Sequence, residues 1–287
     1  MSSLLVACEK EIEFSEEISS PKITVNSGFM PDSLWKVEIS RSLSIIDNGQ
    51  LSDIENANVS IVGSDGSSIV LNYDSQNKYY TSNSLVATNI NYIINVSAPN
   101  FNDVSASGFA PSPININNVN KTIQSISDET IYNFRITFND PPSSEDFYMI
   151  EINKQEVYYI YDVDSTILDS TSFENPTSLS SRDVSADQRE EFTNQITFSD
   201  QLFNGQEKTL SVMTYDYIFD IGSLADKTNY EIKLYRLSKD YYLYKRSILA
   251  YRNVTGNPFA EPVRVFINVE GGFGIFAGLS YSNFLVE

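Results

Sequence analysis

Apolar and polar residues alternate with a period of two along most of the chain, which is the pattern of half-buried β-strands. The clearest case is the segment 35–40, in which Trp35, Val37 and Ile39 share one face. Asp65 and Gly66 form a dipeptide typical of tight hairpin turns. Seven short segments of this kind precede residue 110: 22–26, 35–40, 58–62, 68–73, 79–81, 92–96 and 104–109. The pattern predicts an immunoglobulin-like β-sandwich over residues 21–110.

A second β-rich region follows a predicted linker at 111–121, which contains Pro111, Pro113 and several Asn residues. The serine-rich stretch 162–189 predicts a large polar loop. Strand patterns occur at 130–139, 147–152, 155–161, 196–198, 208–215, 230–237 and 263–269. We therefore expect an all-β, mainly antiparallel protein whose second domain, residues 122–287, is a sandwich or barrel-like structure.

One helix is predicted in the second domain, over residues 238–253. Ser238 is a suitable N-cap, and the Gly256-Asn257-Pro258 sequence would end the helix. An apolar stripe at helical spacing comprises Leu237, Tyr241, Tyr244, Ile248 and Tyr251. We expect this stripe to pack against the second domain rather than to bind a ligand. The glycine-rich segment 271–278 predicts close approach of backbones.

The segment Leu5-Val6-Ala7-Cys8 has the form of a bacterial lipobox, in which the cysteine thiol receives diacylglycerol. Cys8 is the only cysteine of the chain, and an ordinary buried cysteine is the alternative. We interpret residues 1–7 as the remainder of a signal peptide and residues 8–20 as a lipidated acidic tether. The acidic residues of the tether, Glu9, Glu11 and Glu13, resemble a surface-export signal.

Charge and composition exclude several functions. The chain carries 38 acidic and 19 basic residues, a net charge of −19, which would repel the phosphates of nucleic acid. It contains no histidine, the commonest general base and metal ligand. A Ser-His-Asp site or a zinc site of the usual type therefore cannot form, and no cofactor is expected.

Two groups of acidic residues have candidate chemistry. Asp140, Glu145 and Asp146 flank a Pro-Pro pair, and paired carboxylates can hydrolyse glycosides. With 38 acidic residues such groupings arise by chance, so we expect no enzyme activity. The loop residues Asp162, Asp164 and Asp169 alternate as calcium ligands do but lack the remaining features of a calcium loop. We expect a solvated acidic loop and no metal site.

Two other sets of residues are candidates for binding or modification. An aromatic platform for sugars or peptides could comprise Tyr79, Tyr80, Tyr158, Tyr159 and Tyr161, although adjacent tyrosines of a strand point to opposite faces. Three serines lie in Asp-Ser-X or Asp-Ser-Thr sequences that resemble O-glycosylation acceptors: Ser33, Ser165 and Ser170.

Several segments together resemble one known family. They are Cys8 to Glu11, 39–43, 198–205, Tyr241-Tyr242, 256–263 and 268–276. These segments resemble the DUF4249 lipoproteins of Bacteroidota over nearly the whole chain, and the C-terminal block is the most specific. The resemblance implies an outer-membrane lipoprotein, often encoded beside a TonB-dependent receptor. It supplies no catalytic or ligand-binding residue.

We therefore expect a non-catalytic, surface-exposed outer-membrane lipoprotein that assists a TonB-dependent transporter in nutrient capture. A structural or adhesive cell-surface module is the alternative, and a hydrolase is disfavoured. The expected partners are the outer membrane, through a lipid on Cys8, and a TonB-dependent receptor.

Overall fold

The computed structural model describes residues 20–43, 52–126, 129–142, 144–187, 193–217, 225–256 and 259–287. Cys8, Glu9, Glu11 and Glu13 lie outside these residues. The described chain is mostly antiparallel β-sheet with one α-helix, which confirms the all-β prediction. Within these ranges, no helix has both the length and the apolar character needed to cross a bilayer.

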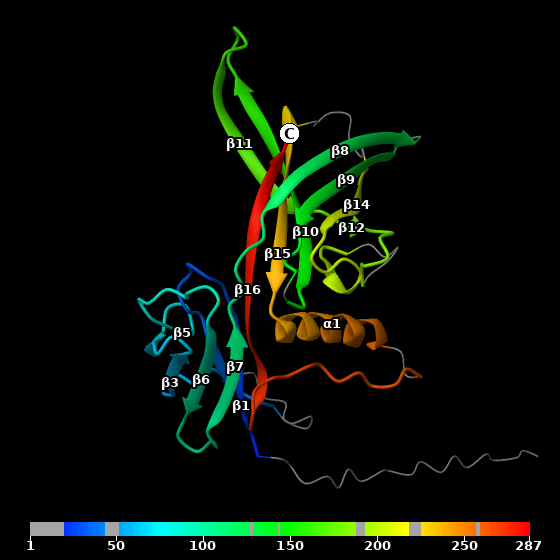
Figure 1. Cartoon of the computed structure of the whole chain (residues 1–287). Coiled ribbons are helices and arrows are strands. Elements are labelled where there is room, and N and C mark those ends of the chain that lie inside the picture. The colour runs from blue at the N-terminus through cyan, green and yellow to red at the C-terminus, as the bar shows by residue number, and fades with distance from the viewer. Residues whose placement is uncertain are drawn as a thin grey trace, which may run out of the picture.

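A five-stranded sheet forms much of the first lobe of the molecule (Figure 1). Its spatial order is β5 (Tyr79–Thr81), β4 (Ser68–Asp74), β3 (Asn58–Gly63), β6 (Asn91–Ser97) and β7 (Val104–Phe109). It packs against β1 (Ile23–Phe29) and β2 (Glu38–Arg41). All seven predicted strands are present, and the predicted stripe of Trp35, Val37 and Ile39 is buried in this core. Gly66 has the positive φ that a tight hairpin turn requires.

A seven-stranded sheet runs through both lobes. Its order is β11 (Ile167–Pro176), β10 (Phe147–Tyr161), β15 (Lys227–Leu237), β16 (Phe273–Val286), β1 and β2, with β13 (Ile196–Ser199) also paired to β10. In the second lobe it packs on a four-stranded sheet of β12 (Leu179–Ser180), β14 (Glu207–Tyr217), β9 (Glu129–Asn139) and β8 (Ile116–Ile126). The second lobe is therefore a sandwich, one of the two architectures expected.

The C-terminal strand β16 belongs to both lobes. Its first half pairs in parallel with β1, from Phe273 to Gly278, and its second half pairs antiparallel with β15. Phe276 is fully buried in the first core, where its ring centroid lies 4.6 Å from that of Phe29. Farther along, Phe284 packs against the second core. A boundary near residue 110 therefore does not separate two independent cores.

Two glycines let β16 approach its neighbours, as the glycine-rich sequence predicts. Gly274 has a φ of +100°, and a Cβ there would overlap the carbonyl oxygen of Val25. A Cβ on Gly278 would overlap the carbonyl oxygen of Phe109 at the end of β7. A larger residue at either position would push β16 away from the first lobe.

Four sequence-based predictions are wrong. The segments 147–152 and 155–161, predicted as the two strands of a hairpin, form the single strand β10. Half of the predicted linker 111–121 belongs to β8, because its Asn-rich sequence still pairs along β9. The predicted polar loop 162–189 contains β11, which continues the hairpin begun by β10. The predicted strand 263–269 is an irregular segment that makes a single bridge to β7 at Glu270. The second and third errors arise because polar strands carry little hydrophobic periodicity.

The helix α1 spans Lys239–Val254, and Ser238 caps it by accepting a hydrogen bond from the backbone amide of Tyr241. The predicted stripe is only partly buried, and Tyr251 at its end is 48% exposed. The buried helical residue is Tyr242, whose ring stacks on Phe147 at 4.5 Å. Leu237 and Tyr241 of the predicted stripe belong to the same cluster as Tyr242, so the start of the helix packs against the sheet as predicted, while the end of the stripe does not.

We predict that Phe276→Ala lowers the free energy of unfolding by about 3–5 kcal/mol, because it removes a buried aromatic ring from the first core. Leu285→Ala, at a 56% exposed position on the same strand, is the matched control and should change it by less than about 1 kcal/mol. Denaturant unfolding of both variants checks this. Equal effects of the two substitutions would show that the C-terminal strand does not complete the first core.

Candidate functional site

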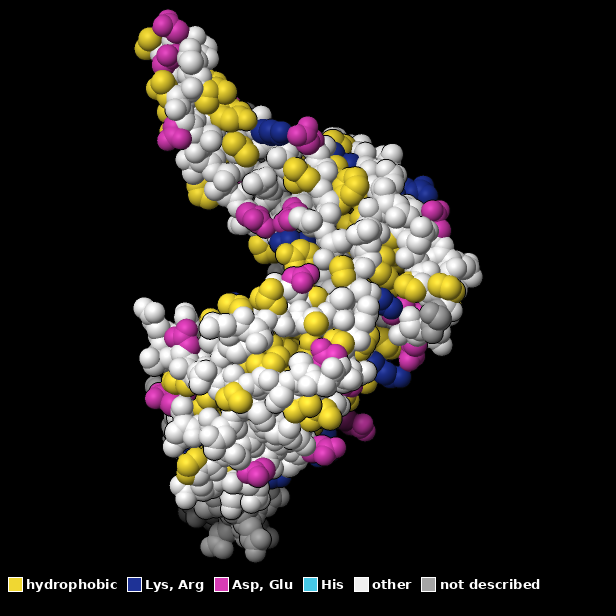
Figure 2. All heavy atoms as spheres, turned by 60° about the vertical axis from the view of Figure 1, so that its left-hand side comes forward, with side chains coloured by type: hydrophobic (Ala, Val, Ile, Leu, Met, Phe, Trp, Pro, Cys, Tyr) yellow, Lys and Arg dark blue, Asp and Glu magenta, His cyan; other side chains and the backbone are white. Residues whose placement is uncertain are grey.

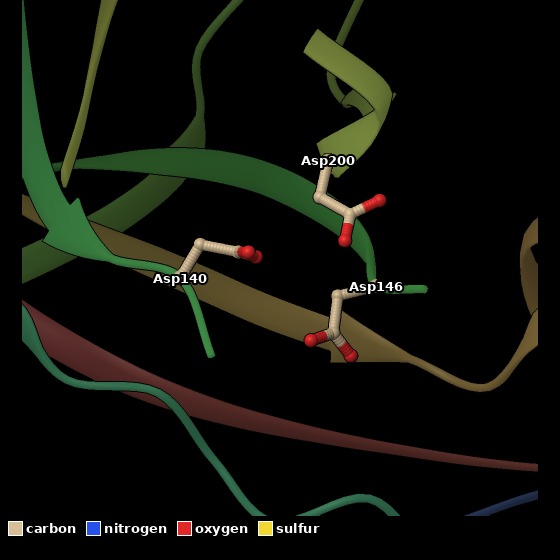
Figure 3. Close-up of side chains that lie close together, drawn as sticks. All are labelled: Asp140, Asp146 and Asp200. Carbon is tan, nitrogen blue, oxygen red and sulfur yellow. The ribbon is translucent and has the colours of Figure 1, made fainter. Parts of the chain in front are cut away.

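Three aspartates form a carboxylate cluster at one end of the second lobe (Figure 3). Asp140 follows β9, Asp146 precedes β10, and Asp200 begins a short 3-10 helix, η1 (Asp200–Leu202), after β13. One carboxylate oxygen from each lies within 4.8 Å of those of the other two. All three residues are at most 5% exposed. The sequence had singled out Asp140 and Asp146, and the fold adds Asp200.

Arg236 supplies the positive charge of this cluster. Its guanidinium lies 2.6 Å from a carboxylate oxygen of Asp146 and also donates to the hydroxyl of Ser112 in the connection between the lobes. The hydroxyl of Ser144 donates to the other oxygen of Asp146 at 2.8 Å. Asp146 is therefore held on both of its oxygens.

The other two carboxylates also have hydrogen-bond donors. The hydroxyl of Tyr148 donates to Asp140, and the backbone amide of Gly205 donates to its second oxygen at 2.8 Å. Gly205 has a φ of +71° in the Asn-Gly turn before β14, which brings its amide to this position. The side-chain amide of Asn204, in the same turn, donates to Asp200 at 3.0 Å.

The acid–base properties of the cluster follow from its burial. Removal from water raises the pKa of the Asp140 carboxyl above its ordinary value, while hydrogen bonds from Tyr148 and Gly205 oppose the shift. Burial likewise raises the pKa of Asp200, and the nearby carboxylates add to the rise. Burial also raises the pKa of the Tyr148 hydroxyl, which keeps it a donor. Asp140 and Asp200 therefore bind a proton more tightly than a free aspartate does.

Carboxylate oxygens are ligands that hard cations prefer, and paired carboxylates can act on glycosides. Here, however, the carboxylates are already engaged by a guanidinium and by neutral donors. Glu145, the third acid of the candidate glycosidase group, lies apart from the cluster in an exposed ion pair with Lys239 at 2.9 Å. The arrangement is that of a structural polar network that joins the turns at this end of the second lobe.

The sequence held one signal for this network. Arg236 occupies a core-facing position of β15, in register with the buried Ile232 and Leu234. A charged residue at such a position requires a buried partner of opposite sign. Only the fold identifies that partner, because Asp146 reaches Arg236 from the loop before β10.

Three of the five tyrosines proposed as a platform lie together on a projecting hairpin. This arm, residues 158–173, consists of the distal parts of β10 and β11 (Figure 1). Tyr158 contacts Phe173 edge-on at 6.0 Å, and Tyr159 contacts Tyr161 at 6.2 Å. Tyr79 and Tyr80 lie elsewhere, in the first lobe. Tyr80 is 1% exposed and donates to the carbonyl of Ile54, so it is a core residue.

The tip of the arm contains the acids considered as calcium ligands. One oxygen of Asp162 accepts hydrogen bonds from the backbone amides of Asp164 and Thr166, which stabilises the turn. Asp169 accepts from the amide of Ser170. Among the described residues, only the Asp140 cluster brings three such acids close enough to share an ion.

The three serines of the predicted O-glycosylation sites lie in different places. Ser33 is half-buried in a turn of the first lobe, whereas Ser165 and Ser170 are exposed on the arm. Ser165 has a φ of +61° at the hairpin turn. The two sites on the arm are therefore accessible at the surface, whereas Ser33 is less so.

Together, the fold and these sites define a two-lobed all-β protein with a projecting arm and a buried polar network. The chain belongs to the DUF4249 family, whose model, described as a domain of unknown function, matches residues 9–284. No curated protein matches the chain. One similar solved structure is described as "Complete structure of manganese lipoxygenase of Gaeumannomyces graminis and partial structure of zonadhesin of Komagataella pastoris". It is 10% identical, with coverage of 76% of this chain and 89% of that chain and a TM-score of 0.19, too low to support any argument.

We predict that Asp200→Asn raises the melting temperature at pH 7. Because burial raises the pKa of Asp200, the folded state binds its proton more tightly than the unfolded state. Stability therefore falls as pH rises from the ordinary carboxyl pKa through the raised one, and Asn removes this cost. The gain should shrink as pH is lowered toward the ordinary value of 3.8.

Asp146→Asn is the matched control, because it removes the ion-pair partner of buried Arg236. It should lower the free energy of unfolding by about 3–5 kcal/mol. Calorimetry of both variants between pH 4 and pH 7 checks these outcomes. A loss of stability in Asp200→Asn at pH 7 would contradict a purely structural role and indicate that the ionised carboxylate is required.

Proposed function

We propose that this protein is a non-catalytic, lipid-anchored protein of the outer-membrane surface that docks on a TonB-dependent transporter and assists nutrient capture. The observation that carries the proposal is the exposed apolar surface of the arm. Its exposed apolar residues are Ile160, Tyr161, Val163, Ile167, Leu168 and Phe173, and their exposed fractions range from 47% to 100%. A two-stranded ribbon is marginally stable in water, and an exposed apolar patch is typical of a binding surface.

The charge of the arm restricts the kind of partner that can bind to it. Residues 155–181 contain five acidic and no basic residues. In Figure 2 the arm projects from the molecule and carries apolar and acidic side chains together. Such a surface is repelled by an anionic membrane and favours a protein with apolar and basic residues at its docking site.

The backbone of the arm also offers a binding edge. Strand β11 is the last strand of the seven-stranded sheet, and every one of its ten residues is exposed. Its sequence has no Lys, and its one Pro stands at the end, so Asp169 and Glu174 are the charged side chains that protect this edge. An extended segment of a partner can add to this edge by backbone hydrogen bonds.

The position of the arm suits a membrane partner with external loops. The first described residues enter β1 at one end of the molecule, and the arm extends from the other end (Figure 1). With a lipid on Cys8, the arm would point away from the anchoring surface. An outer-membrane transporter, which is held in the same plane, presents loops at that height.

The proposal of a non-catalytic role rests on the chemistry of the chain. It contains no histidine, and its buried carboxylates are engaged by Arg236, Tyr148 and backbone donors. A structural or adhesive surface module is the second candidate. It is favoured by exposed apolar residues on the five-stranded sheet, Val62, Val70 and Ile93.

We predict that the triple variant Ile160→Ser, Val163→Ser and Leu168→Ser reduces recovery of a TonB-dependent receptor by about tenfold or more. The measurement is affinity purification from the native outer membrane. The three side chains are exposed, so the melting temperature should stay within a few degrees of wild type.

The matched control is the double variant Val70→Ser and Ile93→Ser, which removes exposed apolar residues from the first lobe. It should recover the receptor as wild type does. Loss of recovery only in this control would place receptor docking on the first lobe instead of the arm. Recovery of no receptor with the wild-type protein would refute the proposed function and favour the adhesive module.

We also predict that Cys8→Ala, expressed with a secretory signal peptide, moves the protein from the membrane to the soluble periplasmic fraction. A lipid anchor contributes about 0.8 kcal/mol for each buried methylene, so its loss should abolish membrane retention. Replacing Glu9, Glu11 and Glu13 with Ala provides the comparison. It should leave the protein lipidated but protected from external protease. Membrane retention of the Cys8→Ala protein would contradict lipidation.

A further inference from the structure

A pocket lies where the two lobes and the helix meet. This junction pocket has a volume of about 370 Å³, near the lower end of the range for small-molecule sites, about 300–1,000 Å³. Gly28 and Met30 line it from the end of β1, Tyr241 from α1, and residues of β10, β15 and β16 complete it. Ligand sites occur preferentially at such junctions, because several elements can contribute to one wall.

Three tyrosines form much of the pocket surface. The rings of Tyr235 and Tyr281 lie 5.3 Å apart at an angle of 41°, and Tyr281 is 43% exposed. Tyr241 approaches the backbone at Gly28, where a Cβ would lie 3.2 Å from its ring. The hydroxyls of Tyr241 and Tyr281 have no hydrogen-bond partner among the described residues. They can therefore donate to, and accept from, a ligand.

A carboxylate in the same pocket is fixed in place. Glu151 accepts hydrogen bonds from the hydroxyl of Tyr235 at 2.8 Å and from the side-chain amide of Gln195, one on each oxygen. Each carboxylate oxygen retains accepting capacity for a further donor. Because both existing donors come from the protein, the carboxylate is oriented before a ligand arrives.

The charges around the pocket favour an uncharged ligand. Lys233 also lines the pocket, where it forms ion pairs with Glu231 at 3.0 Å and Glu174 at 3.9 Å. Lys233 also lies directly opposite Glu151 in the register of β10 and β15, so an ammonium group already stands beside this carboxylate and the three tyrosines do not form a cage for a further cation. Flat aromatic faces next to fixed hydroxyl, amide and carboxylate groups match a ring that is apolar on its faces and bears hydroxyls on its edge.

We infer that the junction pocket binds a neutral saccharide, with Tyr281 and Tyr241 against the sugar ring and Glu151 accepting hydrogen bonds from its hydroxyls. The inference names a ligand class for the proposed capture role. It rests on the proposed function only in assuming that the ligand is a nutrient outside the cell. The pocket and the arm share no residue, so their roles can be tested separately.

The test is binding of neutral oligosaccharides to the purified full chain by saturation-transfer NMR and calorimetry. The probes are maltotriose, cellotriose, xylotriose and N,N′-diacetylchitobiose, with choline as a cationic probe. We expect at least one saccharide to bind. Tyr281→Ala and Glu151→Gln should each weaken that binding by about tenfold, through loss of an aromatic contact and of a charge-assisted hydrogen bond.

Tyr251→Ala is the matched control, because Tyr251 is a similarly exposed tyrosine of α1 outside the pocket, and it should bind as wild type does. Melting temperatures near wild type for the three variants exclude unfolding as the cause. Binding of choline alone, binding unaffected by both pocket variants, or no saccharide binding would overturn the inference. Saccharide binding without recovery of a receptor would refute docking on a transporter and leave the pocket assignment intact.

Discussion

The parallel pairing of β1 with the first half of β16 is the interaction on which the rest of the structure depends. It brings the C-terminal residues of the chain into the core that the N-terminal residues begin, and it places Phe276 beside Phe29 and Trp35. Since β16 continues without interruption beside β15, the same strand carries the sheet into the second lobe. The two sandwiches are thus built on one seven-stranded sheet.

This shared sheet also positions the functional surfaces. The arm is the continuation of its outer strands, β10 and β11, beyond the edge of the second lobe. The junction pocket forms where the end of β1 meets β10, β15, β16 and the helix. A ligand at the pocket and a partner at the arm would therefore both contact β10. The buried network around Arg236 fixes the turns at the end of β10 opposite the arm.

The sequence predicted the fold where periodicity was strong and failed where it was weak. The seven strands predicted before residue 110 were found, because one side of each faces the core and the other faces water, whereas the glycine-rich start of β16 was not predicted as a strand. The segment 167–176 was assigned to a loop because all of its residues are exposed, so no apolar alternation marks it as a strand. The candidate pair Asp140 and Asp146 was identified, but Asp200 was not, since only the tertiary fold brings its loop to them. The junction pocket was missed for the same reason, because its tyrosines come from three separate elements.

The most direct test of the central claim is whether the two lobes unfold at the same denaturant concentration. Trp35, the single tryptophan, is fully buried in the first core, so its fluorescence reports that lobe. Hydrogen exchange of the β9 and β14 amides reports the four-stranded sheet of the second lobe. If one sheet holds both lobes, loss of Trp35 burial and loss of amide protection should share one denaturant midpoint. Unfolding of the first lobe at a lower denaturant concentration, with β9 and β14 still protected, would contradict the account.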